Sequence, residues 1–190
     1  MTDPSQHLFW ITSRAAGTSA MVLASVSVGV GLAMGGRLGK LGGPDRRNIH
    51  QTLSLAVLVA IAMHALALIG DTFLHPSLVD VTVPFVFSYK TLPTSIGIVA
   101  GWSLVVLGLS YYLRGRIGHQ RWKLIHRFTV LAWLGALVHA FIEGSDAGQP
   151  WFIGLILLTA MPALVLLAVR LSTGRASPRR TRGSPLTARC

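Results

Sequence analysis

Five long apolar runs separated by short polar connections limit what this chain can fold into. The runs cover about residues 11–34, 49–70, 94–113, 124–142 and 151–171. A helix of about 20 residues, rising about 1.5 Å per residue, crosses a hydrocarbon layer about 30 Å thick. Because lipid cannot pair with backbone polar groups, apolar segments of this length cross it as helices. The sequence therefore predicts an all-α integral membrane bundle of five transmembrane helices.

Composition agrees with a membrane protein and excludes an ordinary soluble domain. Hydrophobic residues make up 52% of the 190 residues and charged residues only 12%, against about 25% charged in soluble domains. The net charge is +11, but the basic residues lie between the apolar runs rather than on one soluble face. We therefore expect membrane lipid, and no nucleic acid, as a partner. The single cysteine, Cys190, is the last residue and excludes an internal disulfide.

The distribution of basic residues predicts the orientation. Fifteen of the 17 lysines and arginines lie in the connections 35–48 and 114–127 or beyond residue 169, and the other two, Arg14 and Lys90, lie on the opposite side. Cytoplasmic segments carry the excess of positive charge. We therefore expect a multi-pass protein of the cell membrane with its N-terminus outside. The predicted parts are an outer tail at 1–10, a membrane domain at 11–171 and a disordered basic cytoplasmic tail at 172–190.

Four histidines are the candidate functional residues. His50 and His64 lie 14 residues apart in the second run, and His126 and His139 lie 13 residues apart in the fourth. Each interval spans roughly 20 Å of helix. Since both runs cross in the same direction, the depths match as His50 with His126 and His64 with His139. Ionisable side chains in membrane spans are functional candidates, and imidazole is a common axial ligand of haem iron. Two haems b, stacked between the second and fourth spans, are the expected cofactors.

The 13-residue interval poses a geometric problem. Fourteen residues return to within about 40° of the same helix face, whereas 13 residues end about 140° away. The fourth span must therefore bend, wind tightly or present its two histidines at different angles. Gly135, between the two histidines, is the expected place of distortion.

Other side chains are weaker candidates. Arg47 and Arg127 flank the inner histidines, and we expect them to bind haem propionates because a guanidinium forks onto carboxylates. The remaining histidines, His7, His75 and His119, are expected to be solvated loop residues. Three tryptophans are expected at the membrane interface (Trp10, Trp122 and Trp151), and two are expected to pack within spans (Trp102 and Trp133).

The histidine spacing resembles that of the ferric reductase-like transmembrane domain, found in ferric-chelate reductases, NADPH oxidases and YedZ-like haem subunits. Residues 122–127, Trp-Lys-Leu-Ile-His-Arg, look like the start of that family's second ligand helix, and the segments 83–85 and 88–92 are similar to a loop of its short actinobacterial members. The likeness covers about residues 14–170. It implies electron transfer from the cytoplasm through the His50/His126 haem and then the His64/His139 haem to an outer acceptor.

The chain departs from the larger family members because it lacks a flavin- and nicotinamide-binding domain. No glycine-rich dinucleotide motif or phosphate-binding loop is present. We therefore expect an oxidoreductase subunit, with FAD or FMN on a partner flavoprotein, or a quinol, as the cytoplasmic donor. Ferric iron, oxygen or a partner reductase is the expected acceptor. Two alternatives remain open: a histidine-dependent proton or metal transporter, and a membrane assembly protein without a cofactor.

Overall fold

The computed structural model describes residues 7–35 and 44–175, and all of their regular structure is helical. The elements are α1 (Leu8–Gly35), α2 (Pro44–Ile69), α3 (Leu78–Thr82), α4 (Thr91–Leu109), the 3₁₀ helix η3 (Ser110–Leu113), α5 (Arg114–Ile117), α6 (His119–His126), α7 (Thr129–Glu143) and α8 (Pro150–Arg175). Five stretches are long and apolar enough to cross a membrane: α1, α2, Thr91–Ile117, His119–Glu143 and Pro150–Thr173. This confirms the predicted all-α fold with five candidate spans.

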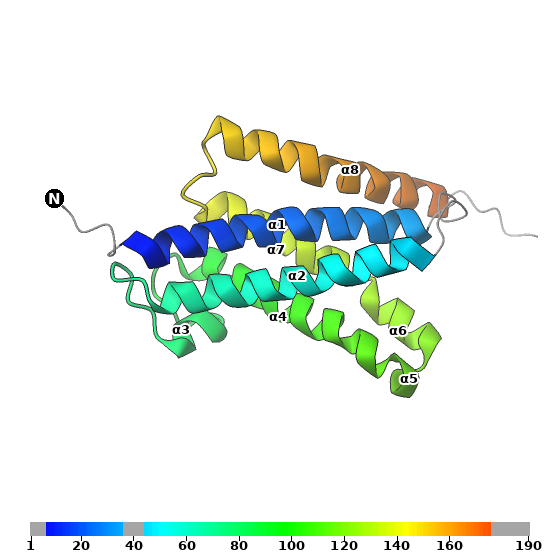
Figure 1. The fold of residues 1–190 in the computed structure, drawn as a ribbon, viewed down its shortest axis with the longest axis horizontal. Helices are drawn as coiled ribbons and strands as arrows, with labels where there is room; N and C mark the ends of the chain where they lie inside the picture. The colour runs from blue at the N-terminus through cyan, green and yellow to red at the C-terminus, as the bar shows by residue number, and fades with distance from the viewer. Residues whose placement is uncertain (1–6, 36–43, 176–190) are drawn as a thin grey trace, which may run out of the picture.

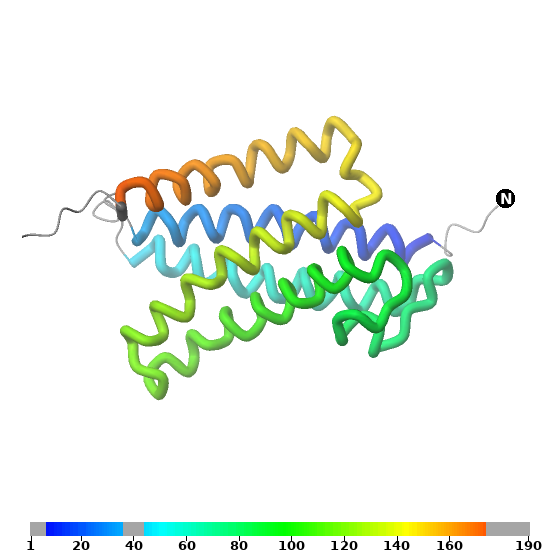
Figure 2. Tube along the Cα trace, turned by 180° about the vertical axis from the view of Figure 1, so that it is seen from behind, coloured from blue at the N-terminus to red at the C-terminus, as the bar shows by residue number. Residues whose placement is uncertain are grey.

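The long helices run back and forth along one axis (Figures 1 and 2). The closest pairings are α1 with α2 and α4 with α7, and α1 also packs on α7 while α2 packs on α4. These four helices form a ring in which α2 and α7 are diagonal to each other. The last helix, α8, packs against α1 on the outside of the ring. The two helices that carry the candidate histidines therefore face each other across the middle of the bundle.

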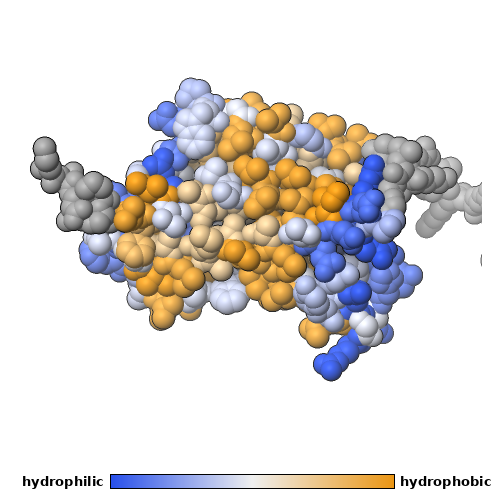
Figure 3. Space-filling model, in the orientation of Figure 1, coloured by the Kyte–Doolittle hydropathy of each residue, from blue (hydrophilic) through white to orange (hydrophobic). Residues whose placement is uncertain are grey.

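The surface suits a lipid environment. Large apolar side chains are exposed along every span, including Leu66, Val106, Leu131 and Leu158. The space-filling view shows apolar residues across the middle of the face drawn and hydrophilic residues gathered at the end where α5 and α6 turn (Figure 3). Five exposed basic residues lie at this end: Arg47, Arg116, Arg121, Lys123 and Arg127. An apolar middle with basic residues gathered at one end is typical of a multi-pass membrane protein.

The buried core lies between α1, α7 and α8. Trp133 is fully buried, and its indole N–H donates to Ser25 Oγ at 3.0 Å. Ser25, itself fully buried, donates to the Met21 carbonyl at 2.8 Å. Every polar atom of this pair is therefore bonded, as burial requires. Trp133 packs within its span, as predicted.

The connection predicted at residues 114–123 is mostly helical, which corrects the prediction of an extended basic loop. The helices α5 and α6 are separated only by Gly118, whose φ of 88° is in a region that favours glycine. Two other boundaries also differ. The second span begins at Pro44, a residue suited to the first turn of a helix, and α8 continues to Arg175. The rest of the predicted disordered tail lies outside the described residues.

The outer connection between α2 and α4 folds back along α4. Its short helix α3 ends at Thr82, whose carbonyl accepts the Trp102 indole N–H at 2.8 Å. The Phe85 N–H donates to Ser95 Oγ at 2.7 Å. Since Trp102 is the twelfth residue of α4, the connection descends along the helix that follows it. Trp102 differs from the prediction, because it is exposed on the surface of α4 rather than packed inside.

Candidate functional site

Two of the four histidines meet near the end of the bundle where α5 and α6 turn. The ring centres of His50 on α2 and His126 on α6 lie 6.1 Å apart, and the ring planes are 87° to each other. Both side chains are half-buried. We call His50 and His126 the inner pair. They belong to the second and fourth spans, whose helices α2 and α7 are diagonal to each other in the ring of four helices.

The other two histidines lie at the opposite end of the same spans. His64 is near the end of α2 and His139 is near the end of α7, and both are half-buried. His139 lies within electrostatic range of His64. We call His64 and His139 the outer pair. The structure thus places one histidine of each span near its inner end and the other near its outer end.

Three of the histidines are held by the same kind of hydrogen bond. His50 Nδ1 donates to the Ser27 carbonyl at 3.0 Å, His64 Nδ1 to the Ser13 carbonyl at 2.8 Å, and His139 Nδ1 to the Pro93 carbonyl at 2.9 Å. Because a carbonyl can only accept, each of these bonds requires the neutral imidazole that carries its proton on Nδ1. In this tautomer the hydroxyl oxygens of Ser27 and Ser13, 3.2 Å and 3.0 Å from the same nitrogens of His50 and His64, also accept. The Nε2 atom of each ring therefore carries a free lone pair. This is the form in which histidine binds a metal.

A glycine follows each of these carbonyl residues by four positions. The pairs are Ser13 with Gly17, Ser27 with Gly31, and Pro93 with Gly97, and we call each pair a carbonyl–glycine motif. A Cβ on Gly17 would lie 3.0 Å from His64 Nδ1, and one on Gly31 would lie 3.2 Å from His50 Cε1. A Cβ on Gly97 would overlap the His139 ring. Each histidine ring therefore lies directly on a helix backbone, in space that a side chain would otherwise fill.

A third glycine of α1, Gly29, allows close helix packing, since its Cβ would be 3.7 Å from Ala163 on α8. Gly17 and Gly31 instead make room for histidines. The four-residue spacing between the residue that supplies the carbonyl and the glycine is visible in the sequence. It does not show which histidine, on another helix, contacts each motif.

The fourth span solves its 13-residue interval by tight winding just after His126. Arg127, Phe128, Val130 and Leu131 each donate their backbone N–H to the residue three positions earlier, at 3.0–3.3 Å. This is the 3₁₀ pattern, which turns about 120° per residue rather than about 100°. Four such residues add about 80° and bring His139 most of the way back to the face of His126. Gly135 was the wrong place: it lies inside the regular helix α7 and packs near Ala100.

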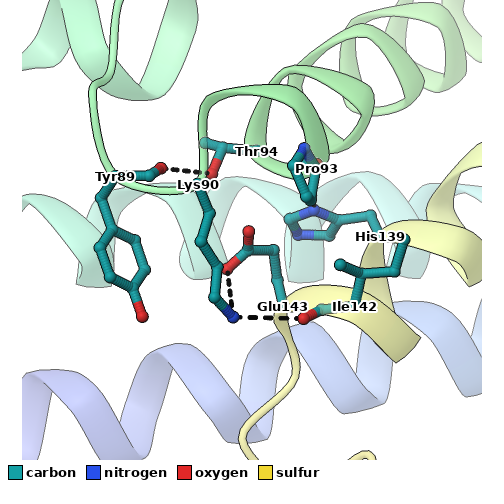
Figure 4. Close-up of polar contacts among 7 residues, drawn as sticks. All are labelled: Tyr89, Lys90, Pro93, Thr94, His139, Ile142 and Glu143. Carbon is teal, nitrogen blue, oxygen red and sulfur yellow. Dashed lines mark hydrogen bonds and ion pairs between the residues drawn. The ribbon is translucent and has the colours of Figure 1, made fainter.

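The outer end is held together by ion pairs between residues that the sequence placed on one side. Lys90 Nζ lies 3.6 Å from a Glu143 oxygen and donates to the Ile142 carbonyl at 3.3 Å (Figure 4). Arg14 Nε donates to Asp146 Oδ2 at 3.0 Å. Figure 4 also shows the His139 ring against Pro93, beside this network. The salt bridges therefore fix the ends of α1, α4 and α7 around the outer pair.

The two arginines predicted to bind propionates lie at the inner end. Arg47 and Arg127 are exposed, and within the described ranges neither side chain makes a hydrogen bond or an ion pair. Arg170 of α8 lies within electrostatic range of Arg127. The sequence analysis counted Arg170 among the cytoplasmic basic residues, at the end of the last predicted span. Both predicted arginines are therefore available to an anionic group, and their role stays a prediction.

Trp122 is the site residue that sequence reasoning missed. Its ring stacks on His126 with centres 5.0 Å apart and planes 24° apart, and on His119 with centres 5.9 Å apart. His119 is exposed, as predicted, and so are His7 and His75. The four-residue step from Trp122 to His126 on one helix face was the available signal. An interfacial role was assigned to Trp122 instead.

The atoms of this site that could bind a metal are the imidazole nitrogens of the inner and outer histidine pairs. In the part of the chain that the structure describes, no group of three or more histidine, cysteine, aspartate or glutamate side chains comes together. A pair of imidazoles suits a metal whose other ligands come from elsewhere, such as the four nitrogens of a porphyrin. Comparison of the chain with protein-family models, with curated proteins and with solved structures gives no match.

Proposed function

We propose that this chain is a b-type membrane cytochrome that holds two haems and carries electrons across the membrane as a ferric reductase-like subunit. The observation that carries the proposal is the 6.1 Å between the ring centres of His50 and His126. A metal–imidazole bond is about 2 Å long, and the ring centre lies about 1 Å behind the bonded nitrogen. Two imidazoles on opposite sides of one iron therefore have centres about 6 Å apart.

The outer pair supports a second haem. His64 and His139 both donate Nδ1–H to backbone carbonyls, which leaves both Nε2 atoms free to bind iron. Such hydrogen bonds fix the ring orientation and raise the basicity of the ligand. A haem iron with two histidine ligands exchanges one electron and has no open position for oxygen. The residues of the chain hold and orient the two groups, and the surrounding apolar helices exclude water.

The inner surface fits an electron donor of acidic character. The exposed basic residues Arg47, Arg116, Arg121, Lys123 and Arg127 lie around the inner pair. A concentrated positive field speeds the encounter with an acidic partner in a salt-dependent way. We propose a flavoprotein that uses NAD(P)H, or a quinol, as donor. The proposed acceptor on the outer side is ferric iron, oxygen or a partner reductase.

The test is an absorbance spectrum of the full chain purified in detergent. We expect a reduced b-type spectrum and a pyridine haemochrome value of two haems b per chain. A colourless protein that conducts protons or metal ions in liposomes would instead favour the transporter. If replacing all four histidines leaves the cellular function intact, the chain acts without the cofactor and the proposal is wrong.

The proposed orientation can be tested with the chain's own cysteine. Cys190 is the only cysteine and is proposed to be cytoplasmic, so a membrane-impermeant maleimide should label it only after the cells are lysed. The matched control is Ser145→Cys in a Cys190→Ser background. Ser145 is exposed in the turn between α7 and α8, and we expect it to be labelled in intact cells. The reverse pattern of labelling would invert the orientation.

A further inference from the structure

The inner pair contains one histidine that is held differently from the other three. We propose that Trp122 is a positioning residue that fixes the ring plane of His126 by stacking, in place of the backbone hydrogen bond that holds His50, His64 and His139. This inference rests on the proposed function, because the ring plane matters through the haem that His126 binds. It assigns Trp122 a role at the iron although it touches only the ligand.

His126 lacks the carbonyl–glycine motif. Its Nδ1 is buried and has no hydrogen-bond partner among the described residues. The Leu107 carbonyl on α4 faces His126 without meeting the geometry of a hydrogen bond to Nδ1. Four positions after Leu107 stands Tyr111 rather than a glycine. At the three carbonyl–glycine motifs, the absence of a Cβ on the glycine lets the histidine ring reach the carbonyl. At His126 no glycine provides this room.

Stacking supplies the missing restraint. Trp122 lies 5.0 Å from His126, centre to centre, with only 24° between the planes. The tryptophan is itself fixed, because its indole N–H donates to Ser110 Oγ at 3.1 Å and Tyr111 packs at 5.9 Å against its ring. His119 covers the other face of Trp122. Rotation of the His126 ring about its own side chain would break this stack, so the orientation of Trp122 determines that of His126.

The consequence is a near-perpendicular inner pair. With Trp122 in place, the planes of His50 and His126 are 87° apart. The angle between two axial imidazole planes determines how anisotropic the electron paramagnetic resonance signal of a low-spin ferric haem is, and perpendicular planes give the most anisotropic signals. The inner haem should therefore show a strongly anisotropic signal that depends on Trp122.

The experiment compares the oxidised, purified wild-type protein with Trp122→Leu and Trp122→Phe, using electron paramagnetic resonance and haem content. The signal of the inner haem is first identified as the one that His126→Ala removes. We expect Trp122→Leu to lower the largest g value of that signal and broaden it, because the His126 ring can rotate. Trp122→Phe keeps a stacking ring and should retain the wild-type signal. The matched control is Trp151→Leu, which removes an exposed tryptophan from α8 and should change neither haem.

The outcomes separate this inference from the proposed function. If the wild-type protein binds no haem, the proposed function fails and this inference fails with it. If two haems are present and Trp122→Leu leaves the inner signal unchanged, the proposed function stands and the positioning role is wrong. Should Trp122→Leu lose the inner haem completely, Trp122→Phe decides: retention of the wild-type signal supports the role of stacking, and equal loss contradicts it.

Discussion

Alanine at His50 or His126 is expected to remove the inner haem and to leave the outer haem in place. Either substitution takes away one of two axial ligands, and the remaining imidazole cannot clamp the porphyrin alone. The pyridine haemochrome value should fall to about half. The two pairs lie at opposite ends of α2 and of the fourth span, His119–Glu143, so the loss should not spread. The same result is expected for the outer haem with alanine at His64 or His139.

The pairing itself is tested by combining substitutions. Because His50 and His126 are proposed to bind one iron, the double variant should retain as much haem as either single variant. Combining His50→Ala with His139→Ala breaks both pairs and should remove all haem. His7→Ala is the control, since His7 is exposed ahead of α1 and is not a proposed ligand, and it should bind the full amount. Loss of all haem in the inner-pair double variant, with haem left in the cross-pair variant, would contradict the pairing.

The spans and the depths of the histidines could be predicted because they depend on local sequence. Apolar runs of about 20 residues define helices in lipid without knowledge of their neighbours. The spacing of His50 and His64 along one helix fixes their separation in depth through the rise per residue. The structure confirms the five candidate spans, and the positions of the histidines follow from them.

The restraints on the histidine rings could not be predicted because they come from distant segments. The His64 bond to Ser13 joins residues 51 apart in the chain, and the His139 bond to Pro93 joins residues 46 apart. These contacts depend on which helices pack together, and the apolar runs of the sequence do not predict which helices do. The tight winding at residues 127–131 was one of three alternatives expected for the fourth span. Its predicted place, Gly135, was wrong, because helical winding depends on hydrogen bonding rather than on glycine alone.

The ring of four helices explains why α1 and α4 matter as much as the helices that carry the histidines. Since α2 and α7 are diagonal, each histidine ring has α1 or α4 beside it. The carbonyl–glycine motifs lie on α1 and α4: two on α1, at Gly17 and Gly31, and one on α4, at Gly97. The two helices without axial histidines thus determine the tautomer and the ring position of three of the four proposed ligands.

Gly97→Ala is therefore expected to abolish the outer haem although residue 97 is not a proposed ligand. The new Cβ would occupy the space of the His139 ring, which is held against α4 by the Pro93 carbonyl at 2.9 Å. The ring must leave its position, and its Nδ1–H bond and the direction of Nε2 are lost with it. The helix itself should not suffer, because alanine in a helix interior is more favourable than glycine by about 0.5–1 kcal/mol.

The matched control for this prediction is one turn away on the same helix. At Gly101 an added Cβ would meet only Ile61 Cγ2, at 3.8 Å, which is ordinary contact. We expect Gly101→Ala to keep both haems and Gly97→Ala to keep only the inner one, measured by haemochrome and by the two signals in electron paramagnetic resonance. Gly17→Ala and Gly31→Ala should be milder, since their added Cβ atoms would lie 3.0 Å and 3.2 Å from the nearest histidine atoms. Equal haem content in Gly97→Ala and Gly101→Ala would show that haem binding by His139 does not depend on the close approach of its ring to Gly97. The carbonyl–glycine motif would then have no role in positioning this ligand.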